Sequence, residues 1–346
     1  MKGISGLFVI MAVFLSVALL SAPAFAANDS DGANEYKTYY DQLDVNGKAL
    51  YDAVSGADAD TRLLTVSLPV PLIVEANDAG RAYMKEKVEE LFNGALVAVK
   101  FGDPMAYWLW GSNAPHENHN VLETAGGLLI VDEIILDVSL YPPYDDGLQE
   151  KIDALRKAVD DFESDSKDLR GKVSDINKYL MNLVTYDKDF KDPEKKSLFD
   201  HDAYGALADE KHYAVCDGYA KAFQLLADKL EITSIQVYGT GVPDLVNHAW
   251  NYVLMDNEKW YAIDVTWNDS GDNAYFLRGG EDFLETHQQG TYILDGVTWK
   301  FDYPALNTIK YDVDPPSYDN YVWVMIAAIC AIVVVVLVHA ARKGNA

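Results

Sequence analysis

The chain has 346 residues, of which 49% are hydrophobic and 12% aromatic, so it can bury a large core and is not a disordered or low-complexity protein. Its 28 Lys and Arg residues are outnumbered by 54 Asp and Glu residues, which gives a formal net charge of −26 at pH 7. Because so acidic a surface repels phosphates, we expect no nucleic-acid partner.

The first 26 residues have the pattern of a secretory signal peptide. Lys2 precedes an apolar run over residues 7–20, and Ala24 and Ala26 are small residues at the two positions that a signal peptidase reads. We therefore expect cleavage after Ala26. The alternative, an uncleaved N-terminal anchor, fits less well with this A-x-A site.

Residues 27–150 form an N-terminal region that we predict to be α/β. Helical spacing of apolar residues indicates a helix over 81–99, an aromatic turn follows over 102–111, and an apolar run over 128–140 predicts one or two strands. His116 and His119 suggest metal ligands, but Pro115 and the neighbouring Asn residues favour a loop, so we expect no metal there. Its role stays open among a substrate platform, a lid and an inhibitory segment.

Helical patterns over 147–159 and 167–186 lead to the stretch AVCDGYAKAFQLLADKLEI, in which Cys216 directly precedes a predicted helix. Asp217 is a plausible N-cap residue of this helix. The N-terminus of a helix stabilises a thiolate, although the Asp217 charge opposes it. Cys216 and Cys330 are the two cysteines of the chain, so Cys216 is either a reactive thiol or an inert buried one.

The segment from His248 to Trp267 alternates as two strands around turn residues. A hairpin centred on Asp256 places His248 directly opposite Asp264, so both side chains project to one face of the sheet. This arrangement requires an odd number of connecting residues, most simply the three from Met255 to Asn257. An imidazole oriented by a carboxylate beside a thiol is the arrangement needed for nucleophilic acyl transfer.

The segments VCDGYAKAF, HAWNYV and WYAIDVTW resemble, in order and spacing, the signature segments of the transglutaminase-like superfamily, especially its exported bacterial and archaeal cysteine-protease-like branch. The resemblance implies a papain-like α+β fold over residues 151–311, with Cys216 as nucleophile, His248 as general base and Asp264 as its orienting partner. It also suggests that Trp250 and Tyr219 form walls of the substrate site, and it implies no metal and no cofactor. Ala214 stands where relatives commonly have Gly.

The C-terminal segment has the pattern of a membrane anchor. We expect a stalk over 312–320, a transmembrane helix over 321–341 that contains Cys330, and a cytoplasmic tail over 342–346. A buried core helix is the alternative for the apolar run. The whole fold class is therefore α+β: a transglutaminase-like core, an N-terminal α/β region before it and a C-terminal transmembrane helix.

These features predict a single-pass membrane protein whose catalytic domain lies outside the cytoplasm. The predicted function is that of a cysteine peptidase or amidohydrolase that acts through an acyl-enzyme on peptide, protein or cell-envelope substrates. Two alternatives remain open. One is a transglutaminase that cross-links proteins by transferring the acyl group to an amine, and the other is a non-catalytic surface module that binds peptide or envelope polymer.

Overall fold

The computed structural model describes residues 39–57, 61–110, 116–137, 147–243, 245–294 and 297–312. The chain divides into two compact units, Met1–Lys37 and Thr38–Ala346, and the described residues all belong to the second unit. The predicted signal peptide, the stalk from residue 313 onward, the predicted transmembrane segment and the tail lie outside the described residues.

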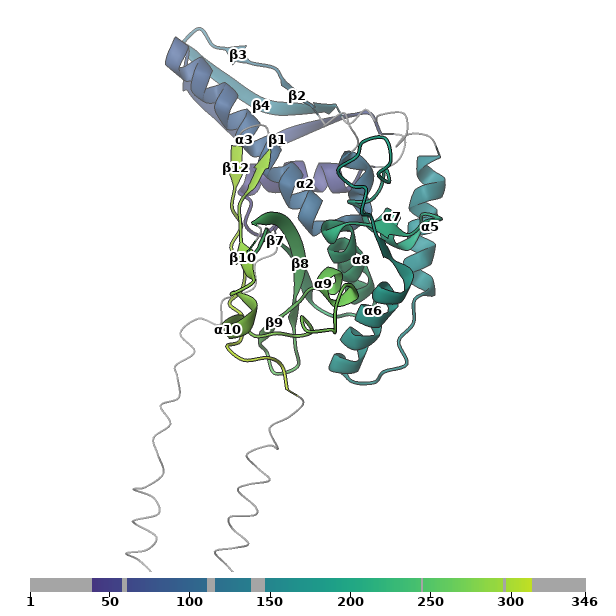
Figure 1. Ribbon diagram of the computed structural model, residues 1–346. Coiled ribbons are helices and arrows are strands. Elements are labelled where there is room, and N and C mark those ends of the chain that lie inside the picture. The colour runs from purple at the N-terminus through teal and green to yellow at the C-terminus, as the bar shows by residue number, and fades with distance from the viewer. Residues whose placement is uncertain are drawn as a thin grey trace, which may run out of the picture. The chain divides into compact units, whose positions relative to one another are not determined.

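The first part of the second unit is an antiparallel sheet covered on one face by a long helix (Figure 1). The elements in chain order are α2 (Val45–Ser55), β1 (Leu63–Glu75), α3 (Asp78–Gly102), the 3-10 helix η1 (Pro104–Trp110), β2 (His116–His119), β3 (Leu122–Glu123) and β4 (Leu128–Asp137). The strand β4 pairs with β1, β2 and β3. The predicted helix and strand are thus present, with α3 longer than expected at both ends.

Amphipathic patterning explains how α3 lies on this sheet. The Asn77 side chain caps the helix by accepting from the Gly80 N–H at 2.8 Å. Val88 of α3 and Val131 and Ile134 of β4 are fully buried in the same core cluster. Burying the apolar stripe of the helix against the apolar face of the strands supplies most of the stability of this layer.

One expectation for this region is wrong. Residues 116–119 are not a loop but the strand β2, in which His116 pairs with Asp137 and His119 with Ile134. Pairing with the long regular strand β4 outweighs the local preference of Pro and Asn for turns.

The rest of the described chain forms a second, four-stranded antiparallel sheet in the order β10-β7-β8-β9, with helices packed against it (Figure 1). Its helices are α5 (Leu148–Asp161), α6 (Leu169–Leu183), α7 (Ala203–Leu207), α8 (Cys216–Lys229), α9 (Val265–Asp269) and α10 (Gly280–Phe283). The sheet consists of β7 (Ser234–Gly241), β8 (Val246–Leu254), β9 (Trp260–Ile263) and β10 (His287–Gln289). Two further pairs of strands form separate small sheets, β5 (Thr185–Tyr186) with β6 (Tyr213–Ala214) and β11 (Tyr292–Leu294) with β12 (Val297–Trp299).

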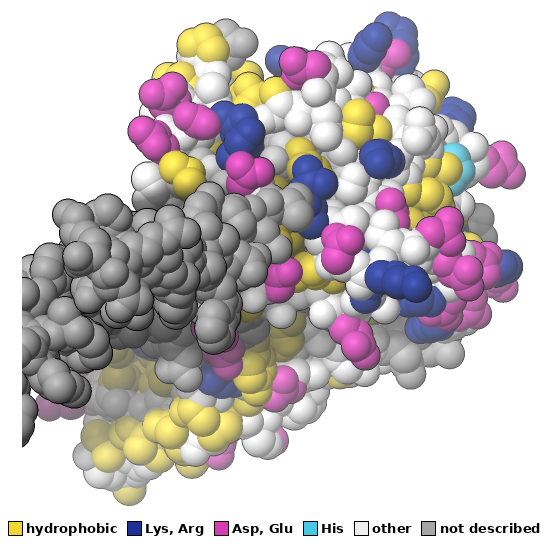
Figure 2. Space-filling model, turned by 90° about the horizontal axis from the view of Figure 1, so that it is seen from below, with side chains coloured by type: hydrophobic (Ala, Val, Ile, Leu, Met, Phe, Trp, Pro, Cys, Tyr) yellow, Lys and Arg dark blue, Asp and Glu magenta, His cyan; other side chains and the backbone are white. Residues whose placement is uncertain are grey.

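The two parts share one hydrophobic core. Buried residues from Leu50 in α2 to Leu277 near the end of the second sheet belong to a single cluster, which crosses the predicted domain boundary near residue 150. On the face shown in Figure 2, acidic side chains are interspersed with basic and hydrophobic ones, so the acidic excess does not form one patch there.

The hairpin of β8 and β9 has a different register from the predicted one. Tyr252 pairs with Ala262 and Leu254 with Trp260, so five residues, 255–259, connect the strands instead of three. The number is still odd. The strand β9 ends at Ile263, and Asp264 is the N-cap residue of α9 rather than a strand residue opposite His248.

The predicted transmembrane helix and single-pass membrane localisation require a correction. Among the described residues, no helix combines the length and the apolar character needed to cross a bilayer. The longest of them, α3, carries charged side chains along its first half, from Asp78 to Glu90. The segment predicted to cross the membrane, 321–341, lies outside the described residues, so a spanning helix is not part of the fold as described.

Candidate active site

Cys216 is the first residue of α8. The N-cap residue is Val215, whose extended backbone turns the chain into the helix without a side-chain cap, so Asp217 is not the N-cap that the sequence suggested. The N–H groups of the first turn have no carbonyl partner within the helix, and they point toward the thiol end of the site. The Cys216 side chain is partly exposed and lines a cavity of about 1390 Å³.

His248 and Asp264 lie together beside this cysteine. His248 projects from β8, and its Nε2 is 2.7 Å from Oδ2 of Asp264. The other carboxylate oxygen, Oδ1, accepts from the Trp267 N–H at 3.1 Å, so the cap of α9 fixes the orientation of the carboxylate. With Nε2 engaged, the free Nδ1 of His248 is the nitrogen available to the thiol of Cys216, whose side chain helps to raise the pKa of the imidazole.

Electrostatics in this group favour a protonated imidazole. Burial disfavours the charged form of His248, but the Asp264 carboxylate and the Cys216 side chain outweigh burial and raise the pKa of His248 to about 10. Burial likewise opposes ionisation of Asp264, yet the charge and hydrogen bonds of the two neighbouring imidazoles lower its pKa to about 2. The carboxylate is therefore ionised while His248 carries a proton at neutral pH.

A second histidine, which no sequence pattern singled out, also contacts Asp264. His287 of β10 is fully buried, and its Nε2 lies 3.1 Å from the same Oδ2 atom that contacts His248. Its Nδ1 lies 2.9 Å from the Thr286 hydroxyl, and its ring stacks on Phe283. Burial lowers the pKa of His287, so a neutral His287 contacts the same carboxylate oxygen as His248.

These three residues, His248, Asp264 and His287, are also the group whose ligand atoms lie close enough together, within 4.8 Å, to suggest a metal site. The distance from His248 Nε2 to the carboxylate is 2.7 Å, which is a hydrogen-bond length. Two ligands of one tetrahedral zinc ion, each about 2.1 Å from it, lie about 3.4 Å apart. The geometry therefore fits a hydrogen-bonded cluster better than a metal centre.

The residues expected to wall the site lie behind it. Trp250 and Tyr219 are each 1% exposed and do not line the cavity. The Tyr219 hydroxyl donates to Asp269 at 2.7 Å. Instead, Trp267 lines the cavity and stacks on His248, with ring centroids 5.1 Å apart.

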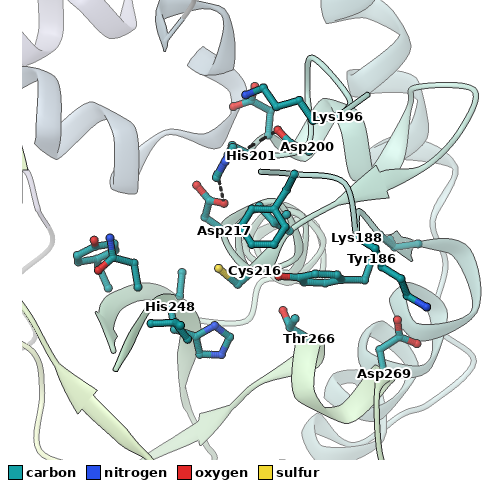
Figure 3. Close-up of a pocket in the computed structure, with 18 of the residues that line it drawn as sticks. Tyr186, Lys188, Lys196, Asp200, His201, Cys216, Asp217, His248, Thr266 and Asp269 are labelled. Carbon is teal, nitrogen blue, oxygen red and sulfur yellow. Dashed lines mark hydrogen bonds and ion pairs between the residues drawn. The ribbon is translucent and has the colours of Figure 1, made fainter. Parts of the chain in front are cut away.

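A further histidine lies on the other side of the cysteine. Figure 3 shows His248 and Thr266 on one side of Cys216, with Asp217 and His201 on the other. His201 Nδ1 is 2.7 Å from Asp217 Oδ1. Burial opposes ionisation of Asp217, but His201 lowers the pKa of this carboxyl to about 2, and the imidazole in turn offsets the negative charge next to the thiol.

Residues 156–265 match the family model of the transglutaminase-like superfamily. This segment is therefore similar to the core of that superfamily. The matched segment contains Cys216, His248 and Asp264, so the resemblance seen in the sequence is confirmed at the level of the superfamily.

The solved structures that are similar to this chain share little sequence identity with it. One is a TGase crystal structure with 18% identity and a TM-score of 0.28, in which the match covers 43% of this chain and 44% of that chain. Another is a candidate cysteine protease from Cytophaga hutchinsonii, with 11% identity, a TM-score of 0.28, and coverage of 51% and 68%. The chain thus spans less than half of the length of the TGase. No curated protein matches it.

Proposed function

We propose that this protein is a cysteine-dependent acyl-transfer enzyme that hydrolyses amide bonds of peptide substrates. The observation that carries the proposal is that a helix-terminal thiol, Cys216, lines the same cavity as the imidazole of His248, which is held 2.7 Å from a buried carboxylate. The match of residues 156–265 to the transglutaminase-like superfamily supports the same class of chemistry.

In the proposed reaction, Cys216 reacts as the thiolate of an ion pair in which His248 holds the proton, and the sulfur attacks the carbonyl carbon of the substrate amide. The oxyanion that forms is met by N–H groups in the first turn of α8. When the C–N bond breaks, His248 donates its proton to the leaving amine, and a thioester remains on Cys216. Water, deprotonated by His248, then attacks the thioester and releases the acid and the free thiol.

Asp264 has two roles in this scheme. It fixes His248 with Nδ1 toward the sulfur, and its charge stabilises the imidazolium that forms when the thiol is deprotonated. His287 is a positioning residue, because it contacts the carboxylate and not the reacting atoms. Trp267, stacked on His248, limits the rotation of the imidazole and covers it from solvent.

The proposal is tested by digesting a peptide library with the wild-type protein and with Cys216→Ala. Products formed only by the wild type support the proposal, and products common to both variants exclude it. Adding an excess of a primary amine separates the acceptors: hydrolysis yields free acids, whereas a cross-linking enzyme yields the substituted amide. Alkylation of Cys216 by iodoacetamide gives a readout that does not depend on knowing the substrate.

A further inference from the structure

Four lysines and four aspartates line the cavity around Cys216 in a protein that is otherwise strongly acidic. Lys188, Lys191 and Lys196 line it, and all three come from the loop that joins β5 to α7 (residues 187–202). Figure 3 shows Lys188 and Lys196 among the side chains around the cysteine. With a net charge of −26, the chain as a whole would repel anions, so this concentration of lysines at the site is notable.

These lysines are not part of ion pairs. Within the described part of the chain, no carboxylate oxygen lies within 4.0 Å of the Nζ atoms of Lys188, Lys191 or Lys196. The neighbouring Lys195 differs, because it pairs with Asp192 at 2.6 Å and does not line the cavity. The three cavity lysines are therefore available to an incoming anion.

Three of the four aspartates that line the cavity have hydrogen-bond or ion-pair partners at normal distances, and the fourth, Asp200, makes no side-chain hydrogen bond among the described residues. Asp217 contacts His201, and Asp269 accepts from the Tyr219 hydroxyl. Asp202 is buried against Lys221, with 3.4 Å between the carboxylate oxygen and Nζ. These contacts partly offset the negative charge on the cavity wall. Burial raises the pKa of Asp200 although His201 and Lys196 oppose this, so Lys196 is partly balanced by Asp200, whereas Lys188 and Lys191 have no carboxylate within 4.0 Å among the described residues.

The loop that carries the lysines is held in place. The Asp187 carboxylate accepts from the backbone N–H groups of Asp189, at 2.9 Å, and Ser197, at 2.7 Å, which ties the two ends of the loop together. The Val215 N–H donates to the Asp200 carbonyl at 2.7 Å, which joins the loop to the residue just before Cys216. A loop fixed in this way loses less conformational entropy when a ligand binds.

We infer that the site takes anionic polypeptide substrates, in which Asp or Glu carboxylates lie beside the amide bond that is cleaved. This inference rests on the proposed function. The lysines of residues 188–196 bind the substrate carboxylates as compact, mobile positive charges with several N–H donors each. The positive charges of the lysines also attract an acidic segment to this cavity, whereas the rest of the acidic surface repels it.

The experiment uses the full-length protein and three peptides that are identical except at the residues flanking one amide, which are Asp and Glu, Asn and Gln, or Lys. We expect the highest kcat/KM for the acidic peptide, and a KM for this peptide that rises with ionic strength. A neutral peptide cleaved as efficiently as the acidic one, with the same salt response, overturns the inference.

The variant Lys188→Glu/Lys191→Glu/Lys196→Glu tests the loop directly. Because each exposed ion pair contributes modestly, we expect kcat/KM for the acidic peptide to fall about tenfold, mainly through KM, with little change for the neutral peptide. Lys195→Glu is the matched control in the same loop and is expected to leave both peptides unaffected. An equal loss on both peptides, or the same loss in the control, contradicts the assignment.

A binding measurement separates this inference from the proposed function. The fluorescein-labelled acidic peptide is titrated with full-length Cys216→Ala, with and without the milder triple change of the three lysines to Gln. Weaker binding of the Gln variant supports the inference, and equal binding overturns it, whether or not any peptide is cleaved. Absence of Cys216-dependent cleavage, by contrast, overturns the proposed function.

Discussion

The two parts of the described chain differ in whether their interiors contain ionisable groups. In residues 39–137 the interior is almost entirely apolar, and ion pairs such as that between Arg81 and Glu123 lie on the surface. In residues 147–312 the interior contains two imidazoles, several carboxylates and an ammonium group. Burying ionisable groups costs free energy unless they are paired and hydrogen-bonded, so their concentration in one part marks that part as the place of chemistry.

The two parts differ in the polar groups that they bury, but they are not structurally independent. Lys100 and Phe101, at the end of α3, line the cavity of the second part. A Cβ atom on Gly94 of α3 would lie 2.6 Å from the Trp299 ring of β12, so the helix and the second part are in direct contact. The first part therefore supplies a wall of the site while holding none of its reacting groups.

The sharpest test of this contrast is a pair of histidine variants, one in each part. His248→Ala removes the proposed proton carrier, and we expect kcat to fall by about 10³-fold or more. His119→Ala, in β2, is expected to leave kcat within about twofold. Peptide hydrolysis by both variants measures the difference, and alkylation of Cys216 at pH 6 to 7 should slow only in His248→Ala. Equal losses in the two variants would remove the contrast.

A smaller loss, with a change in pH dependence, is expected from Asp264→Asn, which keeps the Oδ1 acceptor for the Trp267 N–H. The pKa of His248 is raised from 6.5 to about 10, so its proton is lost only as the pH rises through that value. We expect the alkaline limb of kcat/KM near pH 10 in the wild type. Without the Asp264 charge the limb should move to lower pH, and kcat should fall by about 10²-fold or more. An unmoved limb contradicts the ion pair.

His287 is expected to give an intermediate effect. His287→Phe removes the donor to Asp264, and kcat should fall by about tenfold, which corresponds to the loss of one hydrogen bond to a charged group. His287→Gln retains an N–H donor of similar reach and should recover most of this loss. Steady-state kinetics compares the two variants, and thermal unfolding checks that both are folded. If both variants lose the same activity at equal Tm, the hydrogen bond has no positioning role.

The smallest effect on rate is expected from Ile134→Ala in β4. This side chain is fully buried in the core of the first part, so the free energy of unfolding should fall by about 3 kcal/mol through the cavity left behind. The kcat of the folded protein should not change, because no reacting group is displaced. Denaturant unfolding measures the free energy of unfolding, and peptide hydrolysis measures kcat. A fall in kcat at temperatures where the variant is folded would show that the two parts are coupled in catalysis.

Much of the candidate site could be predicted from local sequence patterns. The apolar stripe of α8 placed Cys216 at a helix start, and alternation along β8 placed His248 on the face that points toward it. The predicted parity of the hairpin was correct although its centre was off by one residue, because parity alone decides which face a side chain occupies. The assignment of catalytic roles to Cys216, His248 and Asp264 stays a prediction until the variants are measured.

The parts that escaped prediction depend on long-range pairing. His287 lies in a strand of three residues, HQQ, whose place beside β7 is set by backbone pairing and not by any periodic pattern. His201 and the lysine loop have no regular structure, and their position follows from hydrogen bonds to distant backbone groups. Short segments of this kind carry too little hydrophobic periodicity for their location to be read from the sequence.

The lysine loop (residues 187–202) is attached just before the nucleophile's helix in a way that would allow the loop to be replaced. The Asp187 N–H donates to the Ala214 carbonyl at 3.0 Å, and the Val215 N–H donates to the Asp200 carbonyl, so both ends of the loop are bonded to the two residues that precede the nucleophile. Residues 188–196 could therefore be exchanged for segments of other length and charge while these anchors, the Ser197 N–H and the buried Phe199 ring keep the thiol in place. Substrate choice would then become a modular property, open to grafting without redesign of the reacting groups.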